Sequence, residues 1–411
     1  MSLSSTAQIA WRNLGRNRRR TALALGAIAV AELVLVFYES LFAGYGDQLV
    51  KSVTGPLVGH AQVHAPKWRE DRAMDRFLPG VEGKLAAIRA VPGVEQAAAR
   101  VYAPTLVARS VDGQAALVVG VDFATERQRG ILDGIPLPPL PEKGGVLVGR
   151  LLADGLGAKA GDELALVGQA SDGSVASGLF TVVAVVDTTV DLVNRVGLLM
   201  SLDDARELLV LPDAAHELVV FGSDPQAAGA LSERLAALEP LAGAEVLGWR
   251  ALAPEFASLI DLMWAYEAFI LVLVFIAAAA GSANTMMMAT FERTREFGML
   301  LALGAKPRRI VSLVVTEGVL LGLLGLAAGA LVGVSLVLIT SRTGIDLSKL
   351  TSGTAESISF IGMKSSMTMF PRLVLGGLWR SLAAVLITSL LAALWPAVRA
   401  ARLQPMEALR S

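Results

Sequence analysis

Four charged side chains lie in or beside apolar stretches that are long enough to cross a membrane: Glu32, Glu39, Glu317 and Arg380. A charge at that depth is costly, so it normally faces a protein interface or a water-filled cavity. In a carrier, such groups can pass protons across the membrane. Because the four come from three separate stretches and show no evident pairing, they fit a cavity-lining or structural role better than a proton relay.

The three histidines are the other candidates for chemistry. If residues 59–63 form a strand, His60 and His64 share one face of it, and His216 lies elsewhere. The chain has no cysteine and these histidines have no obvious carboxylate partner, so the pattern makes only a weak metal site and favours ordinary packing. The net charge of −1 does not suggest a nucleic-acid partner.

The sequence lacks the common motifs for nucleotide binding and hydrolysis. It contains no G-x-x-x-x-G-K-[ST], no H-E-x-x-H and no G-x-S-x-G. The string GVLVG at residues 145–149 is followed by Arg150 and not by a Lys-Ser/Thr pair. We therefore expect no enzyme activity and no bound cofactor in this chain.

Residues 291–310, FERTREFGMLLALGAKPRRI, lie between two long apolar runs and form the most informative stretch. The pattern predicts a short amphipathic helix that ends at Gly304 as the C′ residue, with Pro307 soon after. A charged amphipathic connector between two spans offers a surface to a cytosolic partner. The alternative is that its positive residues only hold the loop inside the cell. The expected apolar side is Phe297, Leu300, Leu301 and Leu303, and the charge comes from Arg293, Arg295, Arg308 and Arg309.

The composition of the chain predicts that the four charged residues named first lie in or beside membrane-spanning helices. The chain has 411 residues, 54% of them hydrophobic, and the apolar excess lies at the N-terminus and in the last third. About 20 residues cross the hydrocarbon core. The expected spans are residues 21–43, 266–290, 310–340 and 372–398. The third span carries small residues that would let another helix approach closely: Gly318, Gly322, Gly325, Ala328, Gly329 and Gly333.

The N-terminal residues 1–20 are basic and amphipathic, which places this end in the cytoplasm. A cleaved signal peptide is the competing interpretation, but the apolar run is too long and Leu41-Phe42-Ala43 is a poor cleavage site. Four crossings then put the loop at residues 291–309 and the tail at residues 399–411 inside. The insert at residues 44–265 and the loop at residues 341–371 lie outside.

The insert alternates short valine-rich strands with helices, which predicts an α+β domain of one or two lobes. Residues 130–145 are rich in proline and glycine and should form a loop. Ser201 is expected to cap a helix. The expected strands are residues 59–63, 115–121, 164–167, 180–186 and 217–221, and the expected helices are residues 81–90, 202–210 and 226–238.

Several strings resemble the permeases of type VII ABC transporters, which include the macrolide-exporter, lipoprotein-releasing and cell-division permeases. The tail PAVRAARLQPMEALR (residues 396–410) resembles the family's terminal signature. RTREFGMLLALGA (residues 293–305) resembles its coupling segment, with Phe297 where isoleucine is usual. Residues 9–20 resemble its N-terminal helix, and residues 145–168 and 180–209 resemble parts of its periplasmic domain. The resemblance covers nearly the whole chain and is closest in appearance to the lipoprotein-releasing permeases.

The resemblance implies an α-helical membrane protein with four transmembrane helices and an inserted α+β periplasmic domain, in the bacterial inner membrane with both termini cytoplasmic. It implies a second permease copy or a sister permease, membrane lipids around the spans, and a separate P-loop ATPase dimer that carries ATP and Mg²⁺. It also implies a periplasmic carrier or adaptor. The residues expected to couple to the ATPase are Glu292, Arg293, Arg295, Glu296, Phe297, Gly298, Leu303, Gly304 and Ala305.

The cargo is not specified by these motifs. Extraction or release of lipoprotein, or another lipid-like cargo, is the first expectation. An efflux permease with a periplasmic adaptor and an outer-membrane channel is the second. A mechanotransmitter that controls a periplasmic enzyme is the third, because the outer domain of that type is usually smaller. A proton-driven carrier is disfavoured, since four spans with one large insert show no inverted repeat.

Overall fold

The structure is a computed structural model that describes residues 3–16, 18–110, 112–136, 143–350, 357–360, 363–366 and 368–401. It divides into two compact units. Unit 1 comprises Met1–Gly46, Ile260–Leu347 and Thr368–Ser411, and unit 2 comprises Asp47–Leu259 and Ser348–Met367. Of the expected tail at residues 399–411, residues 402–411 lie outside the described residues.

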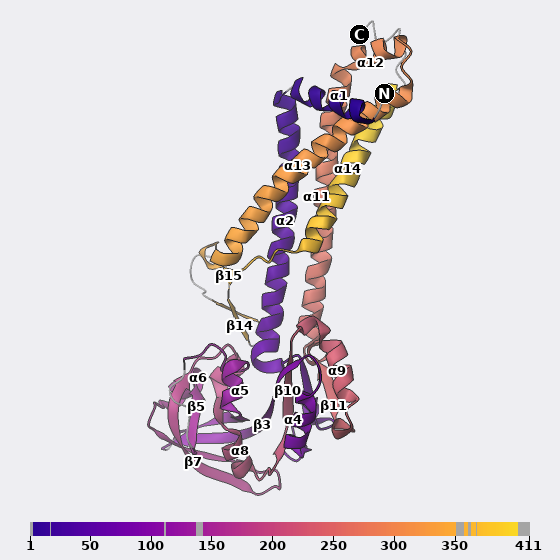
Figure 1. Ribbon diagram of the computed structural model, residues 1–411. Coiled ribbons are helices and arrows are strands. Elements are labelled where there is room, and N and C mark those ends of the chain that lie inside the picture. The colour runs from indigo at the N-terminus through magenta and orange to yellow at the C-terminus, as the bar shows by residue number, and fades with distance from the viewer. Residues whose placement is uncertain are drawn as a thin grey trace. The chain divides into compact units, whose positions relative to one another are not determined.

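Unit 1 is helical (Figure 1). Among the residues that the structure describes, four helices are long and apolar enough to cross a membrane. The helix α1 and the short α12 lie at the same end of this bundle (Figure 1). The helices are α1 (Leu3–Arg16), α2 (Arg18–Val53), α11 (Pro254–Glu292), α12 (Thr294–Ala302), α13 (Pro307–Thr343) and α14 (Leu375–Ala401).

Two of these helices are longer than the apolar runs that predict them. The sequence suggests a span ending at residue 43 and an insert running to residue 265, but α2 continues to Val53 and α11 begins at Pro254. Isolated glycines such as Gly44 and Gly46 weaken a helix without ending it, whereas proline does. The regular helix accordingly changes to a π-helical turn, η1 (Thr54–Val58), around Pro56.

The glycines of α13 bring it close to α2. A Cβ on Gly325 would lie 2.6 Å from Ile28, one on Gly333 would lie 3.2 Å from Val36, and one on Gly329 would overlap the Ala29 carbonyl. Figure 1 shows α13 crossing α2 obliquely. Both helices therefore contact each other through residues four apart, and the close approach predicted for the third span is confirmed.

Unit 2 is built on a mixed sheet in the order β11-β1-β10-β3-β4-β8-β5-β7-β6. The long strand β3 also pairs with β6, so the last six strands close into a barrel. The expected loop at residues 341–371 contributes to this unit the short strands at residues 357–360 and 363–366, whereas residues 345–346 and 368–369 pair within unit 1. The strands of the sheet are β1 (Ala61–His64), β3 (Val94–Arg109), β4 (Asp112–Val121), β5 (Gly145–Gly149), β6 (Glu163–Gln169), β7 (Val175–Val186), β8 (Gly197–Ser201), β10 (Glu217–Gly222) and β11 (Glu245–Gly248). The short pairs are β2 (Leu78–Pro79) with β9 (Ala214–Ala215), β12 (Ile345–Asp346) with β15 (Thr368–Met369), and β13 (Ser357–Phe360) with β14 (Met363–Ser366).

Helices flank this sheet. The largest buried apolar cluster contains Val63 of β1 together with Leu164 of β6, so the open sheet and the barrel share it, and a second cluster contains Val119, Leu147 and Leu199. The cap predicted for Ser201 is confirmed, because its Oγ accepts a hydrogen bond from the Asp204 N–H at 3.0 Å. The helices are α3 (Trp68–Asp71), α4 (Val81–Arg89), α5 (Phe123–Gln128), α6 (Arg150–Leu156), α7 (Asp191–Val196), α8 (Leu202–Leu209), α9 (Ala228–Ala236) and α10 (Trp249–Leu252).

Candidate functional site

The expected coupling segment contains α12, a separate helix between α11 and α13. Its end has the geometry predicted from the sequence. Gly304 adopts a left-handed φ of 85° and donates its N–H to Leu301 O at 3.0 Å, and Ala305 donates to Leu300 O at 3.0 Å. This pair of bonds is the Schellman motif that terminates a helix at a glycine. Pro307 then begins α13.

The sequence pattern predicted a single apolar side for α12. In the structure its apolar residues face two different directions. Phe297 is 1% exposed and packs with Leu301 against α11, α13 and α14. Leu303 is 85% exposed, and Met299 and Leu300 are also exposed. Successive residues turn by about 100° around a helix, so residues 297 and 301 face one way and residues 299 and 303 face the other. One apolar face therefore holds α12 to its own bundle, and the other is open to a partner.

A chain of charged groups links α12 to two other helices. Glu296 pairs with Arg16 of α1, and its Oε2 accepts from Arg293 Nε at 3.1 Å. Arg293 also donates a hydrogen bond from Nη1 to Oε2 of Glu317 on α13, at 2.8 Å. The side chains of Arg293 and Glu317 are only 12% and 6% exposed. This charge chain, Arg16–Glu296–Arg293–Glu317, joins α1, the start of α12 and α13.

Two further contacts hold the charge chain in place. The Arg293 guanidinium lies 5.1 Å from the centre of the Phe297 ring, close enough for a cation–π interaction. Burial opposes the charged form of Glu296, but hydrogen bonds and attraction from Arg16 and Arg293 outweigh it and lower the pKa of Glu296. The carboxylate is therefore ionised at neutral pH.

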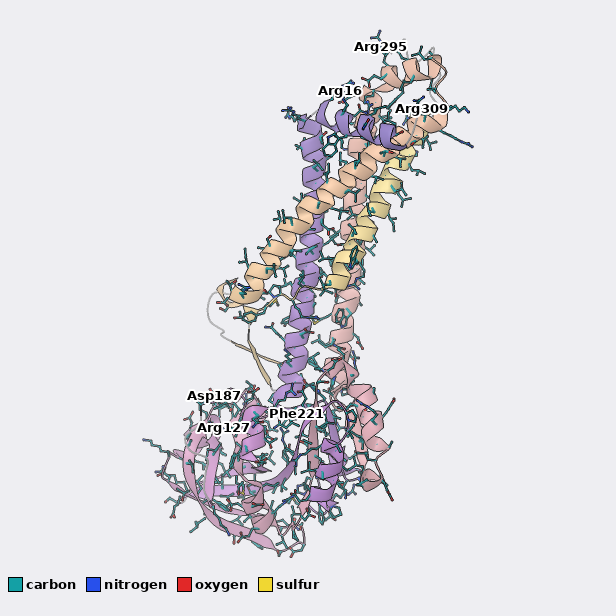
Figure 2. All side chains as sticks on the ribbon, in the orientation of Figure 1. Arg16, Arg127, Asp187, Phe221, Arg295 and Arg309 are labelled. Atoms are coloured by element: carbon teal, nitrogen blue, oxygen red, sulfur yellow. The ribbon has the colours of Figure 1, made fainter. Side chains whose placement is uncertain are left out.

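The remaining residues of the expected coupling set differ in exposure. Glu292 and Arg295 are exposed, Gly298 is buried against the bundle, and Ala305 is half-buried. Figure 2 shows Arg295 at the same end of unit 1 as Arg16 and Arg309. Together with the exposed Met299, Leu300 and Leu303, the charged Glu292 and Arg295 form a charged and apolar surface on the outside of α12.

The four charges expected near a cavity separate into two places. Glu39 of α2 pairs with Arg380 of α14, and Glu32 accepts from Ser381 Oγ at 2.8 Å. The Glu32 Oε2 atom is buried and has no hydrogen-bond partner among the described residues. Glu317 belongs instead to the charge chain. Gly329 lies beside Glu32 and follows Glu317 by twelve residues of the same helix. Glu317 is therefore about 18 Å along α13 from the level of Glu32.

The sequence interpretation missed Glu267, a further buried carboxylate. It lies on α11 with 5% of its surface exposed and interacts electrostatically with Glu39 and Arg380. Its position near the start of the second apolar run was the available signal, because a carboxylate there is as costly as those in the other spans.

The histidines serve packing in unit 2. His60 precedes β1, and its Nδ1 accepts from the Gly222 N–H at 2.8 Å. Burial, aided by the charge of Arg129, lowers the pKa of His60 to about 4. His64 is fully buried and stacks on Trp68. Among the described residues, no group of three His, Cys, Asp or Glu side chains is arranged to hold a metal ion.

Two family profiles match the chain. Residues 21–238 match the MacB-like periplasmic core domain, and residues 268–405 match the FtsX-like permease C-terminal domain. The first covers more than half of the chain and includes α2 and most of unit 2. The second covers the other three long helices and α12.

Individual proteins are also similar to the chain. The lipoprotein-releasing system transmembrane protein LolC of Neisseria meningitidis is 25% identical over 95% of this chain and 94% of its own length. The pyoverdine export ATP-binding/permease protein PvdT of Pseudomonas fluorescens is 34% identical over 32% of this chain and 16% of its own. The periplasmic region of MacB from Actinobacillus actinomycetemcomitans aligns with 48% of this chain and 92% of its own, at 10% identity and a TM-score of 0.35.

The resemblance seen in the sequence is thus confirmed at the level of the family. The profile matches cover most of the insert as well as the C-terminal helices. The chain belongs to the FtsX-like and MacB-like permeases, the membrane subunits of type VII ABC transporters.

Proposed function

We propose that this permease couples ATP hydrolysis by a separate cytoplasmic ATPase, which holds ATP and Mg²⁺, to movement of its outer domain. The observation that carries the proposal is the charge chain. A partner that pushes on α12 moves Arg293 and Glu296, and Arg293 is paired with a buried group of α13. Coupling through packed helices of this kind requires two discrete arrangements of the bundle.

The docking surface for the ATPase is the exposed side of α12. Met299, Leu300 and Leu303 supply apolar area, and Arg295 supplies charge. A central apolar anchor with a charged rim is typical of protein interfaces. The buried side of α12 passes the force on, because Phe297 packs against the bundle and cannot move without it.

From α13 the movement reaches α2 through the glycine row. Gly325, Gly329 and Gly333 bring the α13 backbone against Ile28, the Ala29 carbonyl and Val36 of α2. Such close packing leaves little free space between the helices to absorb a displacement. Since α2 has residues in both units and continues to Val53, it provides a continuous path toward the outer domain.

The arrangement in the membrane follows from charge. Arg16, Arg295 and Arg309 lie at one end of unit 1 (Figure 2), which supports a cytoplasmic position for that end. Both termini are then cytoplasmic, unit 2 is periplasmic and the protein resides in the bacterial inner membrane. A second permease copy or a sister permease completes the transporter.

We infer that the cargo is a lipoprotein or another lipid-like molecule released from the membrane. The support is the similarity to LolC, which extends over 95% of this chain. An efflux permease with a periplasmic adaptor is the second candidate, favoured by the 34% identity to the pyoverdine export protein over 131 residues. A proton-driven carrier gains no support, because Glu317 is paired with Arg293 and lies away from Glu32 and Glu39. A mechanotransmitter that controls a periplasmic enzyme ranks last.

The test is affinity purification of the chain from its native membrane with an ATP analogue, followed by mass spectrometry. A P-loop ATPase with an acylated lipoprotein supports the proposed function. An ATPase with an adaptor and an outer-membrane channel supports efflux. The variant Leu303→Asp should lose the ATPase, whereas Leu303→Met, which keeps an apolar side chain of similar volume, should retain it. Recovery of the ATPase with both variants would show that α12 is not the docking site.

A further inference from the structure

The outer end of α2 is held by one fully buried arginine. In unit 2, the chain leaves α2 through the π-helical turn η1, and Arg100 of β3 reaches the carbonyl groups of that turn. The Arg100 side chain is 0% exposed. It donates to Leu57 O at 2.7 Å, to Pro56 O at 3.1 Å, to Glu126 Oε1 and Oε2 at 2.6 and 3.0 Å, and to Glu217 Oε1 at 3.3 Å.

These five bonds account for all five N–H groups of the guanidinium. Burial by itself would disfavour the charged form, but the neighbouring Glu126 and Glu217 raise the pKa of Arg100, so it is always charged. Glu126 is also fully buried, and its Oε2 accepts from the Ile131 N–H at 2.8 Å. The Arg100 donors and both Glu126 oxygens are therefore satisfied, which leaves one fixed position for the Pro56–Leu57 turn.

Arg100 occupies a special place on β3. It is the residue at which the pairing of β3 changes, because Arg100 lies opposite Glu217 of β10 on one side and Val121 of β4 on the other. The segment before it belongs to the open sheet, and the segment after it belongs to the barrel. A force applied to the Arg100 side chain thus reaches both parts of unit 2.

Stability alone does not account for this network. A buried ion pair is often no more stabilising than apolar residues of the same volume, whereas it fixes geometry closely. Lysine would keep the charge, but it has three N–H donors instead of five and lacks the planar fork, so it could not make all five bonds. The contacts to Pro56 and Leu57 involve backbone groups, so they restrain the course of the chain.

We propose that Arg100 is a positioning residue that fixes the end of α2 to the strand shared by the open sheet and the barrel. A displacement of α2 then moves the whole of unit 2 as one body. The use of this joint for transport rests on the proposed function. The rigidity of the joint is a property of the chain itself and can be measured without an ATPase.

The test uses two spin labels, at K51C near the end of α2 and V175C on β7. Both positions are exposed, and the chain has no native cysteine to compete for the label. In the full chain in lipid nanodiscs we expect one narrow distance between the labels. The variant Arg100→Lys should lose that single distance and give a broad or split distribution. Arg109→Lys is the matched control, because Arg109 lies on the same strand but its ion pair with Asp162 is partly exposed.

An unchanged narrow distance in folded Arg100→Lys overturns the proposal. If Arg100→Lys does not fold, as judged by tryptophan fluorescence, Glu126→Gln takes its place, and an unchanged distance there has the same meaning. In the complex with the ATPase, a fluorophore on V175C should respond to the ATP analogue. In Arg100→Lys this response should be at least about fivefold smaller than in the unchanged chain, while basal ATP hydrolysis persists. Absence of any ATPase would refute the proposed function and leave the distance measurement valid.

Discussion

The charge chain predicts that two isosteric substitutions at its two carboxylates have very different effects on stability. Glu317→Gln leaves Arg293, which is only 12% exposed, with Glu296 as its remaining partner. Glu296→Gln leaves Arg293 paired with Glu317 and leaves Arg16, whose side chain is 65% exposed, in contact with water. Both changes remove one negative charge and preserve side-chain volume, so each serves as a control for the other.

The magnitudes follow from exposure. Removing one member of a buried ion pair costs about 3–5 kcal/mol, and the partial exposure of Arg293 places Glu317→Gln at the lower end, about 3 kcal/mol. That loss is roughly a 150-fold change in the unfolding equilibrium. Exposed ion pairs contribute about 0.2–1 kcal/mol, so Glu296→Gln should cost less than about 1 kcal/mol.

The assay is reversible unfolding in mixed detergent micelles, followed by tryptophan fluorescence. The double variant Arg293→Met, Glu317→Met should regain much of the stability lost in Glu317→Gln, because apolar residues can replace a buried ion pair. It should not regain ATP-dependent activity, because the charge chain no longer links α12 to α13. Equal destabilisation by Glu317→Gln and Glu296→Gln would refute the assignment of Glu317 as the buried end of the chain.

Three further predictions concern other parts of the molecule. Gly329→Ala should destabilise the chain by about 1–3 kcal/mol, because its Cβ would overlap the Ala29 carbonyl, whereas Gly281→Ala, whose Cβ meets nothing within 4 Å, should not; equal melting temperatures would contradict this. His60 is neutral in the folded protein with a pKa of about 4. The unfolded chain, with a histidine pKa of about 6.5, then binds the extra proton, so this contribution to stability is complete above pH 6.5 and is lost as the pH falls toward 4. Unfolding of His60→Asn across this range should lack that dependence. Ser201→Ala removes the cap of α8 and should lower the free energy of unfolding by about 1 kcal/mol, measurable as a shift of the denaturant midpoint; an unchanged midpoint would show that the cap contributes nothing.

Features set by a few neighbouring residues could be predicted from the sequence. The end of α12 at Gly304 depends on a glycine and the proline that follows, and the start of α8 depends on Ser201. The close approach of α13 to α2 depends on glycines repeated every four residues. In each case the conformation is decided within one or two turns of helix, so no knowledge of distant contacts was needed.

The strand β3 was not predicted, although unit 2 is organised around it. Its first half is rich in alanine, which has low strand propensity, and it contains a charged Arg100 and Pro104. These residues are stable in a strand only because β10, β4 and β6 pair with it and because Glu126 neutralises Arg100. Strand β4 follows β3 directly in a hairpin, but β6, β10 and Glu126 lie further along the chain, and their contacts leave no local pattern.

The candidate site was predicted in part. The division of α12 into a buried and an exposed face follows from helical rotation and could have been found by placing Phe297 and Leu303 on a helix. The pairing of Arg293 with Glu317 could not have been predicted from the sequence, because the two residues lie 24 positions apart on different elements. A charge inside an apolar run indicates that a partner exists but does not identify it.

The two contacts of α13 lead to a last prediction about combined variants. Glu317 and Gly329 are twelve residues apart, which places them about 18 Å apart along the helix and about 120° apart around it. They share no partner, because Glu317 binds Arg293 whereas Gly329 meets Ala29 and Glu32. The stability losses of Glu317→Gln and Gly329→Ala should therefore add within about 0.5 kcal/mol.

Activity should behave differently from stability in the same double variant. If force passes from α12 to α13 and then to α2, the two contacts act in series, and breaking either one interrupts the path. The ATP-dependent response of the double variant should then equal that of the single variant with the smaller response. Its stability should nevertheless be lower than that of either single variant. Multiplicative losses of response would show that α12 and α2 act on the outer domain by independent routes, and the charge chain would no longer be the route by which ATP hydrolysis moves α2.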